Sequence, residues 1–223
     1  MKNISKKNKD TAGKYLSVLV IDNYDSFVYN LVHYLEDLDC EVTVRRNNEI
    51  SLEEVAQYDK ILLSPGPGIP DEAGLLKAIV KEFAATKSIL GVCLVQQAIG
   101  EVFGGKLINL ETVYHGVATK VIKNVTDEAL FNDIENEFEV GRYHSWVVDS
   151  NLPTCLEATS FDENGQVMSL RHREYDVRGV QFHPESVLTP NGKLMIKNWV
   201  SSGVEKTTIT KGKDFFPQEE PDL

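Results

Sequence analysis

Fully apolar runs and amphipathic segments alternate along the first half of the chain. Runs that are apolar throughout are typical of strands buried on both faces of a sheet, and apolar residues at helical spacing indicate helices. The pattern predicts strands at Tyr15–Ile21, Glu41–Arg45, Ile61–Leu63 and Ser88–Val92, with helices after Asp25 or Ser26, over Ala73–Phe83 and from Leu94. This alternation predicts right-handed βαβ units and a parallel sheet covered on both faces.

The second half of the chain consists of short alternating runs with few helices between them. They predict strands near Gly105–Ile108, Val117–Ile122, Phe138–Tyr143, Cys155–Thr159, Val167–Leu170 and Val177–Phe182, a turn of helix at Glu128–Ile134 and a last helix over Lys193–Val200. We therefore expect an α/β fold in three layers. A mostly parallel central sheet is flanked by helices, and a smaller antiparallel sheet lies in the second half.

Length and charge narrow the class of protein. The 223 residues suffice for one α/β domain with a sizeable core. We find no repeat or internal linker and predict one domain over residues 15–201, between a flexible tail at 1–14 and a polar tail at 202–223. The net charge of -11 argues against a nucleic-acid partner, because phosphate contacts need clustered Lys and Arg.

The cysteines and the first apolar run bear on the compartment. Cys40, Cys93 and Cys155 are an odd number without C-x-x-C spacing, which argues against a disulfide framework and a cysteine-rich zinc site. The apolar run that ends before Asp22 is too short to span a membrane. We expect a cytoplasmic protein that does not act on a membrane.

Cys93 stands at the corner between a predicted strand and a predicted helix, directly after Gly91 and Val92. Most lone cysteines are small buried hydrophobic residues, so the residue type alone favours a core role. The position favours chemistry, because open α/β sheets bind ligands at the carboxyl ends of their strands. A helix N-terminus also favours the thiolate form of a cysteine. We interpret this corner as a nucleophile elbow.

His183 and Glu185 follow another apolar run and are two residues apart. Zinc deaminases also carry H-x-E, but they need P-C-x-x-C downstream, and no cysteine follows Cys155. We therefore predict no metal site. A lone H-x-E favours a purely structural histidine and a solvated glutamate. Together with Cys93, it favours a triad of nucleophile, general acid/base and orienting carboxylate.

Ser64-Pro-Gly-Pro-Gly68, followed by Ile69 and Pro70, is rich in turn-forming residues and also follows a strand. A surface turn is the usual meaning of Pro-Gly repeats. Glycines also let backbone N–H groups approach a ligand closely. The N–H groups of Gly66 and Leu94 could together form an oxyanion hole beside Cys93.

These motifs match a family pattern. Asp22-Asn-Tyr-Asp-Ser-Phe27, Ser64-Pro-Gly-Pro-Gly68, Gly91-Val-Cys-Leu94, Gln97, Gly141-Arg-Tyr-His-Ser145 and Val180-Gln-Phe-His-Pro-Glu-Ser186 occur in family order. Over roughly Tyr15 to Ser201 the chain resembles the class I (triad) glutamine amidotransferases, whose fold is flavodoxin-like. The opening motif and Trp146 after His-Ser resemble the branch of anthranilate synthase and aminodeoxychorismate synthase small subunits.

The resemblance implies a glutaminase mechanism. The Cys93 thiolate attacks the side-chain amide of glutamine, and the N–H groups of Gly66 and Leu94 hold the oxyanion. His183 protonates the departing ammonia and then activates water, while Glu185 fixes the histidine's orientation.

The resemblance also implies a substrate site and a partner. The glutamine-binding residues would be Gly66, Pro67, Gly68, Gln97, Ser145 and Trp146. His115 and His144 would be structural or lie at a partner interface. The ammonia would pass to a large synthase subunit that aminates chorismate and uses magnesium. No cofactor is implied in this chain itself.

The elbow departs from the family pattern G-x-C-x-G at two positions. Val95 stands where the family has glycine, and Gln96 stands where this branch often has histidine. The Gln96 change is the milder one, since that position does no acid/base chemistry. A branched side chain at Val95 adds bulk next to the nucleophile, and a displacement of 1 Å can cost about 10²-fold in rate.

Three interpretations therefore compete. In the first, the chain is a working glutaminase subunit of anthranilate synthase in tryptophan biosynthesis or, alternatively, of aminodeoxychorismate synthase in folate biosynthesis. In the second, it is an impaired variant that docks or regulates while its partner uses free ammonia. The third, a structural α/β protein, leaves the triad and the matching glycines unexplained. The retained triad favours the enzyme.

Overall fold

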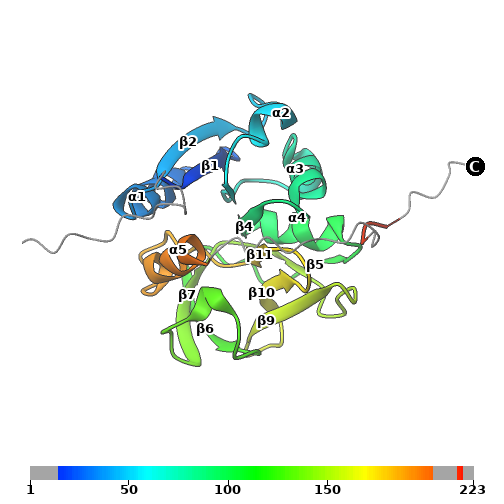
Figure 1. The fold of residues 1–223 in the computed structure, drawn as a ribbon. Coiled ribbons are helices and arrows are strands. Elements are labelled where there is room, and N and C mark those ends of the chain that lie inside the picture. Colours follow the sequence, from blue (N-terminus) through cyan, green and yellow to red (C-terminus); the bar gives the residue numbers. More distant parts are fainter. Residues whose placement is uncertain (1–14, 203–214, 218–223) are drawn as a thin grey trace, which may run out of the picture.

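The computed structural model describes residues 15–202 and 215–217, and one twisted sheet forms its centre (Figure 1). The strand order in this sheet is β2-β1-β3-β4-β11-β10-β9-β6-β7. The five strands at one side are parallel: β1 (Ser17–Asp22), β2 (Glu41–Arg46), β3 (Lys60–Leu63), β4 (Ser88–Val92) and β11 (Val177–Val180).

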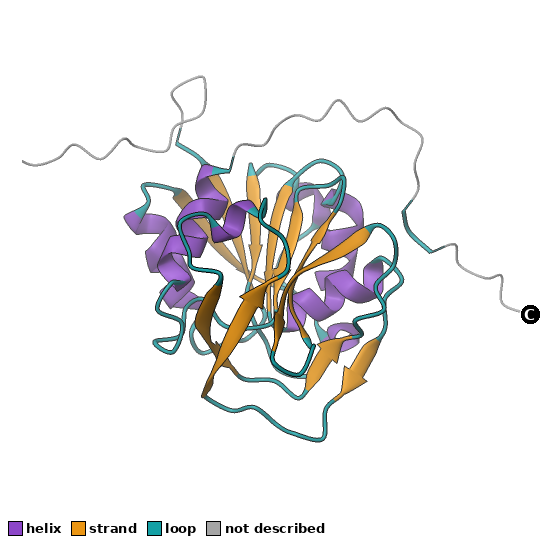
Figure 2. Cartoon of the chain, turned by 90° about the horizontal axis from the view of Figure 1, so that it is seen from below, coloured by secondary structure: helices purple, strands orange, loops and turns teal. Residues whose placement is uncertain are grey.

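Helices cover both faces of the parallel strands, as Figure 2 shows from below. The helices α1 (Val28–Asp37) and α5 (Gly192–Ser201) pack on one face, and α2 (Leu52–Val55), α3 (Leu76–Phe83) and α4 (Leu94–Val102) pack on the other. Successive residues of β1 alternate between the two faces. Val18 and Val20 pack in the core beneath α1 and α5, and Leu19 and Ile21 pack in the core beneath α2, α3 and α4. A strand buried on both faces must be apolar throughout, which explains the continuous run.

The other strands extend the same sheet with antiparallel pairing. They are β10 (Val167–His172), β9 (Leu156–Asp162), β6 (Val117–Lys123) and β7 (Glu137–Arg142). A separate two-stranded antiparallel sheet pairs β5 (Leu107–Asn109) with β8 (Trp146–Val148). The α/β class, the parallel sheet between helices and the antiparallel second half are thus confirmed.

Several element bounds differ from the sequence-based expectation. The helix α1 begins at Val28, because the Asp25 carboxylate accepts a hydrogen bond from Phe27 N (2.8 Å) and holds the chain in a turn instead of capping a helix there. Short 3₁₀ helices span Pro70–Glu72 and Ala129–Phe131. The sequence analysis missed α2, although Ser51 caps it by accepting from Glu54 N, and it missed β8.

The structure describes part of the predicted C-terminal tail but none of the predicted N-terminal tail. Residues 1–14 lie outside the described part of the chain. Within 202–223, Phe215 packs edge-on against His172 (ring centroids 4.9 Å apart), and Phe216 stacks on Phe103 (5.4 Å). Part of the polar tail therefore carries an aromatic anchor. No helix within residues 15–202 and 215–217 combines the length and apolar character that a membrane span needs.

Candidate active site

Cys93 occupies a sharp turn between β4 and α4. Its φ of 53° and ψ of -101° place a non-glycine residue in a sparsely populated region, which is the kind of strain that marks functional sites. The turn is held by a hydrogen bond from Cys93 N to the Val180 carbonyl (2.7 Å) and one from Gln97 N to the Cys93 carbonyl (3.4 Å). The strand-to-helix elbow expected from the sequence is present.

His183 and Glu185 lie just past β11, the strand next to β4. His183 N donates to the Gly141 carbonyl (3.0 Å), and the Thr189 hydroxyl donates to the His183 carbonyl (2.7 Å). The imidazole Nδ1 lies 2.6 Å from Glu185 Oε1, and both side chains are buried. Because a carboxylate only accepts, Nδ1 carries the proton in this bond. Glu185 therefore orients the ring.

The other ring nitrogen, His183 Nε2, is buried and has no conventional hydrogen-bond partner in the described residues. Burial lowers the pKa of His183, but its interactions with the Cys93 sulfur and with Glu185 raise it, and the balance is about 10. The imidazole is thus held positive next to the sulfur. Such a pair suits proton transfer between nucleophile, base and substrate.

Gly66 lies against the loop after β1. A Cβ atom at Gly66 would come within 2.5 Å of the Asn23 carbonyl and 3.2 Å of a Leu94 methyl, so only glycine fits. Asn23 also donates from its side chain to the Ser64 carbonyl (2.7 Å) and accepts from Asn47 Nδ2 (3.0 Å). These bonds fix the Pro-Gly loop beside the first turn of α4, where backbone N–H groups have no intrahelical acceptor.

Cys93 lines two cavities. One, of about 230 Å³, is lined by Cys93 and Leu94 together with all six residues predicted to bind glutamine. This volume suits a ligand the size of an amino acid better than a larger molecule. The glutamine-binding roles remain predictions, but the structure brings the residues that were predicted for them together.

The second cavity, of about 420 Å³, lies on the side of His183 and Glu185 and reaches the loop after β1. Asp25 lines it, and the pKa of this carboxyl is raised, first by burial and then by the nearby Glu185 charge. His115, expected to be structural or to lie at a partner interface, is exposed and lines both cavities. Cys93 therefore connects an amino-acid-sized cavity with a wider opening.

His144 is buried and lines the smaller cavity. Arg142 Nε donates to its Nε2 (3.1 Å), so the proton of the neutral ring is on Nδ1, which donates to the Trp146 carbonyl (3.0 Å). Arg142 is itself paired with buried Asp162 (2.7 Å). The structural role of His144 agrees with the expectation, since its bond to the Trp146 carbonyl fixes the backbone there.

Tyr143 is a site residue that the sequence analysis did not single out. Its ring packs edge-on against His183, with centroids 4.7 Å apart, and its hydroxyl lies 3.1 Å from Ser186 Oγ. It lines both cavities. Its position inside the motif Gly141 to Ser145 was the available signal.

Val95, the departure from the family pattern, is fully buried and packs over Gly91. A Cβ atom at Gly91 would be 2.4 Å from Val95 Cγ1. Gln96 is also buried, and its amide donates to the Val167 carbonyl (3.1 Å). The branched side chain thus fills space that Gly91 leaves open, and the elbow bonds of Cys93 form with Val95 in place.

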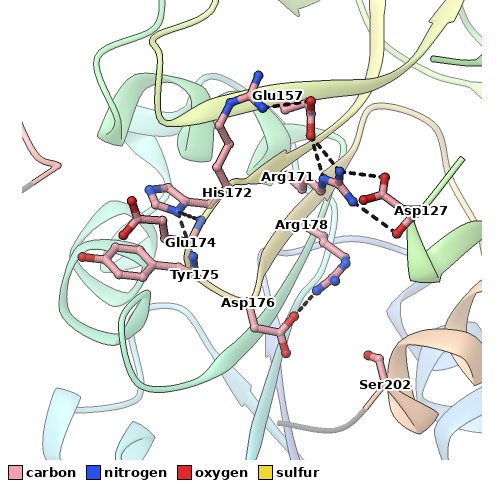
Figure 3. A pocket seen from close by; sticks show the side chains of 10 residues that line it. Asp127, Glu157, Arg171, His172, Glu174, Tyr175, Asp176, Arg178 and Ser202 are labelled. Carbon is pink, nitrogen blue, oxygen red and sulfur yellow. Dashed lines mark hydrogen bonds and ion pairs between the residues drawn. The ribbon is translucent and has the colours of Figure 1, made fainter. Parts of the chain in front are cut away.

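A third cavity, of about 530 Å³, lies at the opposite end of the sheet, where β11 begins; Figure 3 shows the side chains that line it. Its arginines are paired with carboxylates: Arg171 with Glu157 and Asp127, and Arg178 with Asp176. None of the predicted site residues lines it. Within the described ranges there is no cluster of three or more His, Cys, Asp or Glu side chains that could hold a metal ion.

Replacing Val95 with glycine should lower the free energy of unfolding by about 3 kcal/mol, because it empties buried volume and places glycine inside a helix. The rate at which iodoacetamide alkylates Cys93 should change little, since the elbow bonds are backbone bonds. Urea unfolding and site-resolved alkylation test both points. Faster alkylation at unchanged stability would show that Val95 distorts the elbow.

Stability should depend on His144 at acid pH. Burial, followed by the charge of Arg142, lowers its pKa to about 3, although the bond to Trp146 favours the charged ring. An unfolded histidine has a pKa of about 6.5. Between these values the unfolded state binds more protons, so stability is lost as pH falls from 6.5 towards 3.

Gln at position 144 can still accept from Arg142 but does not titrate. We expect His144→Gln to remove up to about 1.4 kcal/mol of this loss per pH unit. Urea unfolding of both proteins at about pH 7 and about pH 5 measures the difference. Equal losses in the two proteins would show that His144 is not held neutral.

Comparisons with known proteins agree with this geometry. The model of the family "Glutamine amidotransferase class-I" matches residues 19–202. The bifunctional protein TrpGD of Thermotoga maritima is 46% identical over 189 residues, which are 82% of this chain but only 32% of that protein. Aminodeoxychorismate synthase component 2 of Klebsiella aerogenes is 43% identical over 82% of this chain and 99% of its own length.

Anthranilate synthase component 2 of Pseudomonas aeruginosa is 42% identical, over 82% of this chain and 94% of its own length. Among solved structures, a proposed GMP synthase subunit from Thermoplasma acidophilum superposes with a TM-score of 0.75 at 25% identity, covering 83% of this chain and 92% of that chain. The extent of the family match and the likeness of these relatives lead to one conclusion: the chain belongs to the class I glutamine amidotransferases.

Proposed function

We propose that the chain hydrolyses L-glutamine at Cys93 and delivers the ammonia to a chorismate-aminating synthase subunit. One observation carries the proposal. Cys93 stands at an elbow between an amino-acid-sized cavity and a wider opening, next to a histidine that a buried glutamate orients. This arrangement supplies a nucleophile, a proton carrier and an exit.

In the first half of the reaction, the Cys93 thiolate adds to the amide carbon of glutamine. The new oxyanion is stabilised by the N–H groups of Gly66 and Leu94. The positive His183 then donates its Nε2 proton to the amide nitrogen, the C–N bond breaks, and ammonia leaves a glutamyl thioester on Cys93. Burial and the Cys93 and Glu185 contacts that set the pKa of His183 keep this proton in place until the nitrogen can accept it.

In the second half, neutral His183 takes a proton from water, and the resulting hydroxide attacks the thioester. Glutamate leaves, and the thiolate and the charged imidazole are restored. Glu185 keeps the ring in one orientation through both halves, because its bond to Nδ1 leaves only Nε2 to exchange protons. No other group in the chain is required to carry a proton in this scheme.

The surface around the wider cavity supports a docked partner. Tyr24, Phe27 and Val187 line this cavity and are exposed, Val187 to 94%. Exposed apolar side chains grouped around an opening are typical of protein interaction sites. A synthase subunit seated there would receive ammonia directly. It would also carry the chorismate site and its magnesium, and a reducing cytoplasm would keep Cys93 a free thiol.

The relatives support both chorismate branches with nearly equal identity, 42% for an anthranilate and 43% for an aminodeoxychorismate component. We favour anthranilate synthase in tryptophan biosynthesis, with the folate branch as the alternative. The elbow bonds formed around Cys93 with Val95 in place support a working glutaminase over an impaired docking subunit.

Cys93→Ser should abolish glutamine-dependent product formation by the reconstituted complex and leave the ammonia-dependent reaction intact, because only the first uses the sulfur. Cys155→Ser is the matched control: that cysteine lies outside both cavities, and its variant should retain both reactions. Chorismate amination with each nitrogen source measures the split. Equal loss of both reactions in Cys93→Ser would refute the assigned role.

The partner can be identified by reconstitution. The purified chain is mixed in turn with the large subunits of anthranilate synthase and of aminodeoxychorismate synthase, and glutamine-dependent amination of chorismate is assayed by product. We expect amination with the large subunit of anthranilate synthase. Activity only with that of aminodeoxychorismate synthase would move the chain to the folate branch, and activity with neither would overturn the proposed partner.

A further inference from the structure

Gln181 lies beside the nucleophile, although the mechanism above gives it no role. It follows β11 directly, and its side chain is completely buried. Its backbone N–H donates to the Met168 carbonyl (2.9 Å), while the preceding residue accepts the bond from Cys93 N. Neighbouring strand ends therefore hold Gln181 and Cys93 next to each other. Its amide Nε2 lies 3.5 Å from Cys93 Sγ.

The orientation of the Gln181 amide follows from its neighbours. Gln97 Nε2 lies 3.0 Å from the Trp146 carbonyl, which can only accept, so this atom of Gln97 must be the NH₂ group. The same NH₂ group lies 3.3 Å from the Gln181 side chain, which must therefore present its oxygen. The NH₂ group of Gln181 is then the part that faces the sulfur. No choice of amide flip remains.

The far end of this hydrogen-bonded chain is rigid. The Trp146 carbonyl also accepts from His144 Nδ1, and Arg142, paired with Asp162, fixes that ring. The route from the ion pair to the sulfur contains only buried or half-buried groups. Each hydrogen bond along this route has only one possible donor and one possible acceptor. The Gln181 NH₂ group that reaches Cys93 is therefore held in place before any substrate binds.

We propose that Gln181 is a further catalytic residue, whose amide donates a hydrogen bond to the Cys93 sulfur, stabilises its negative charge and holds it for attack. The proposal rests on the proposed glutaminase function of Cys93. The amide of Gln181 donates a hydrogen bond without giving up its proton, so it leaves the proton transfers of the reaction to His183. Hydrogen bonds to the charged form of a group favour that form. A sulfur that interacts with both Gln181 and His183 also has less freedom to rotate away from the substrate.

The same geometry connects the nucleophile with the substrate cavity. Gln97 uses both of its N–H groups, on Trp146 and on Gln181, which leaves its carbonyl oxygen as the polar atom still available. Gln97 lines the smaller cavity. An ammonium group is the partner that an acceptor oxygen suits. An amino acid bound in this cavity would therefore contact the series of hydrogen bonds that runs from Gln97 through Gln181 to the Cys93 sulfur.

The test is the pH profile of Cys93 alkylation by iodoacetamide, resolved by mass spectrometry in the full chain. Gln181→Met removes the donor at similar length, and Gln181→Glu replaces it with an acceptor. We expect the midpoint of the profile to move up by about one pH unit in Gln181→Met, and further in Gln181→Glu. Gln166→Glu is the matched control: it still accepts from Arg142 at the distant end, and its profile should equal that of the wild type.

Unshifted profiles in folded Gln181 variants would overturn the proposal, because a residue that only fills space has no effect on when the sulfur ionises. A measurement on the wild-type protein covers variants that do not fold. The side-chain NH₂ resonance of Gln181 should titrate with the midpoint of Cys93 alkylation, and a resonance that ignores this transition would also refute the bond.

The alkylation assay uses neither glutamine nor a partner, so the two proposals can fail separately. A shifted profile in Gln181→Met, combined with a complex that never uses glutamine, would reject the proposed function and keep the hydrogen bond. An unshifted profile, combined with loss of glutamine-dependent product in Cys93→Ser, would reject the role of Gln181 and keep the proposed function.

Discussion

The parallel pairing of β4 with β11 is the constraint on which the site depends. The two strands are in register from Val177 opposite Ile89 to Val180 opposite Val92, so both end at the same edge of the sheet. A hydrogen bond from Cys93 N to the Val180 carbonyl (2.7 Å) continues the pairing past the strand ends. Residues far apart in the chain therefore become neighbours at this edge, and a slip of one residue would turn each side chain to the other face.

Two histidines near the sulfur differ in charge. The imidazole of His183 is positive, with its pKa raised to about 10 despite burial, because of Cys93 and Glu185. His144, which lines the smaller cavity with Cys93, is held neutral, with its pKa lowered to about 3 by burial and by Arg142. The neighbours of each histidine decide which of the two rings carries charge. Two histidines of one motif-rich edge thus have opposite electrostatic roles.

Sequence patterns predicted the α/β class, the parallel strands and the elbow, because continuous apolar runs and a Gly before a lone Cys are local signals. The start of α1 was not predictable, since the Asp25 carboxylate turns the chain just before it. The position of Gln181 between Gln97 and Cys93 could not be derived either. It depends on strand register and on amide directions that only the folded chain defines. The roles of the glutamine-binding residues stay predictions.

The contact between Gly91 and Val95 has a consequence for how this corner can change over evolutionary time. The two positions share one small volume, because a Cβ at Gly91 would lie 2.4 Å from Val95 Cγ1. The valine at position 95 occupies this volume, so position 91 has no room for a side chain as long as Val95 is present. A side chain at position 91 is therefore conditional on a smaller residue at position 95, so among descendants of this sequence a change at Val95 to glycine should come before any change at Gly91.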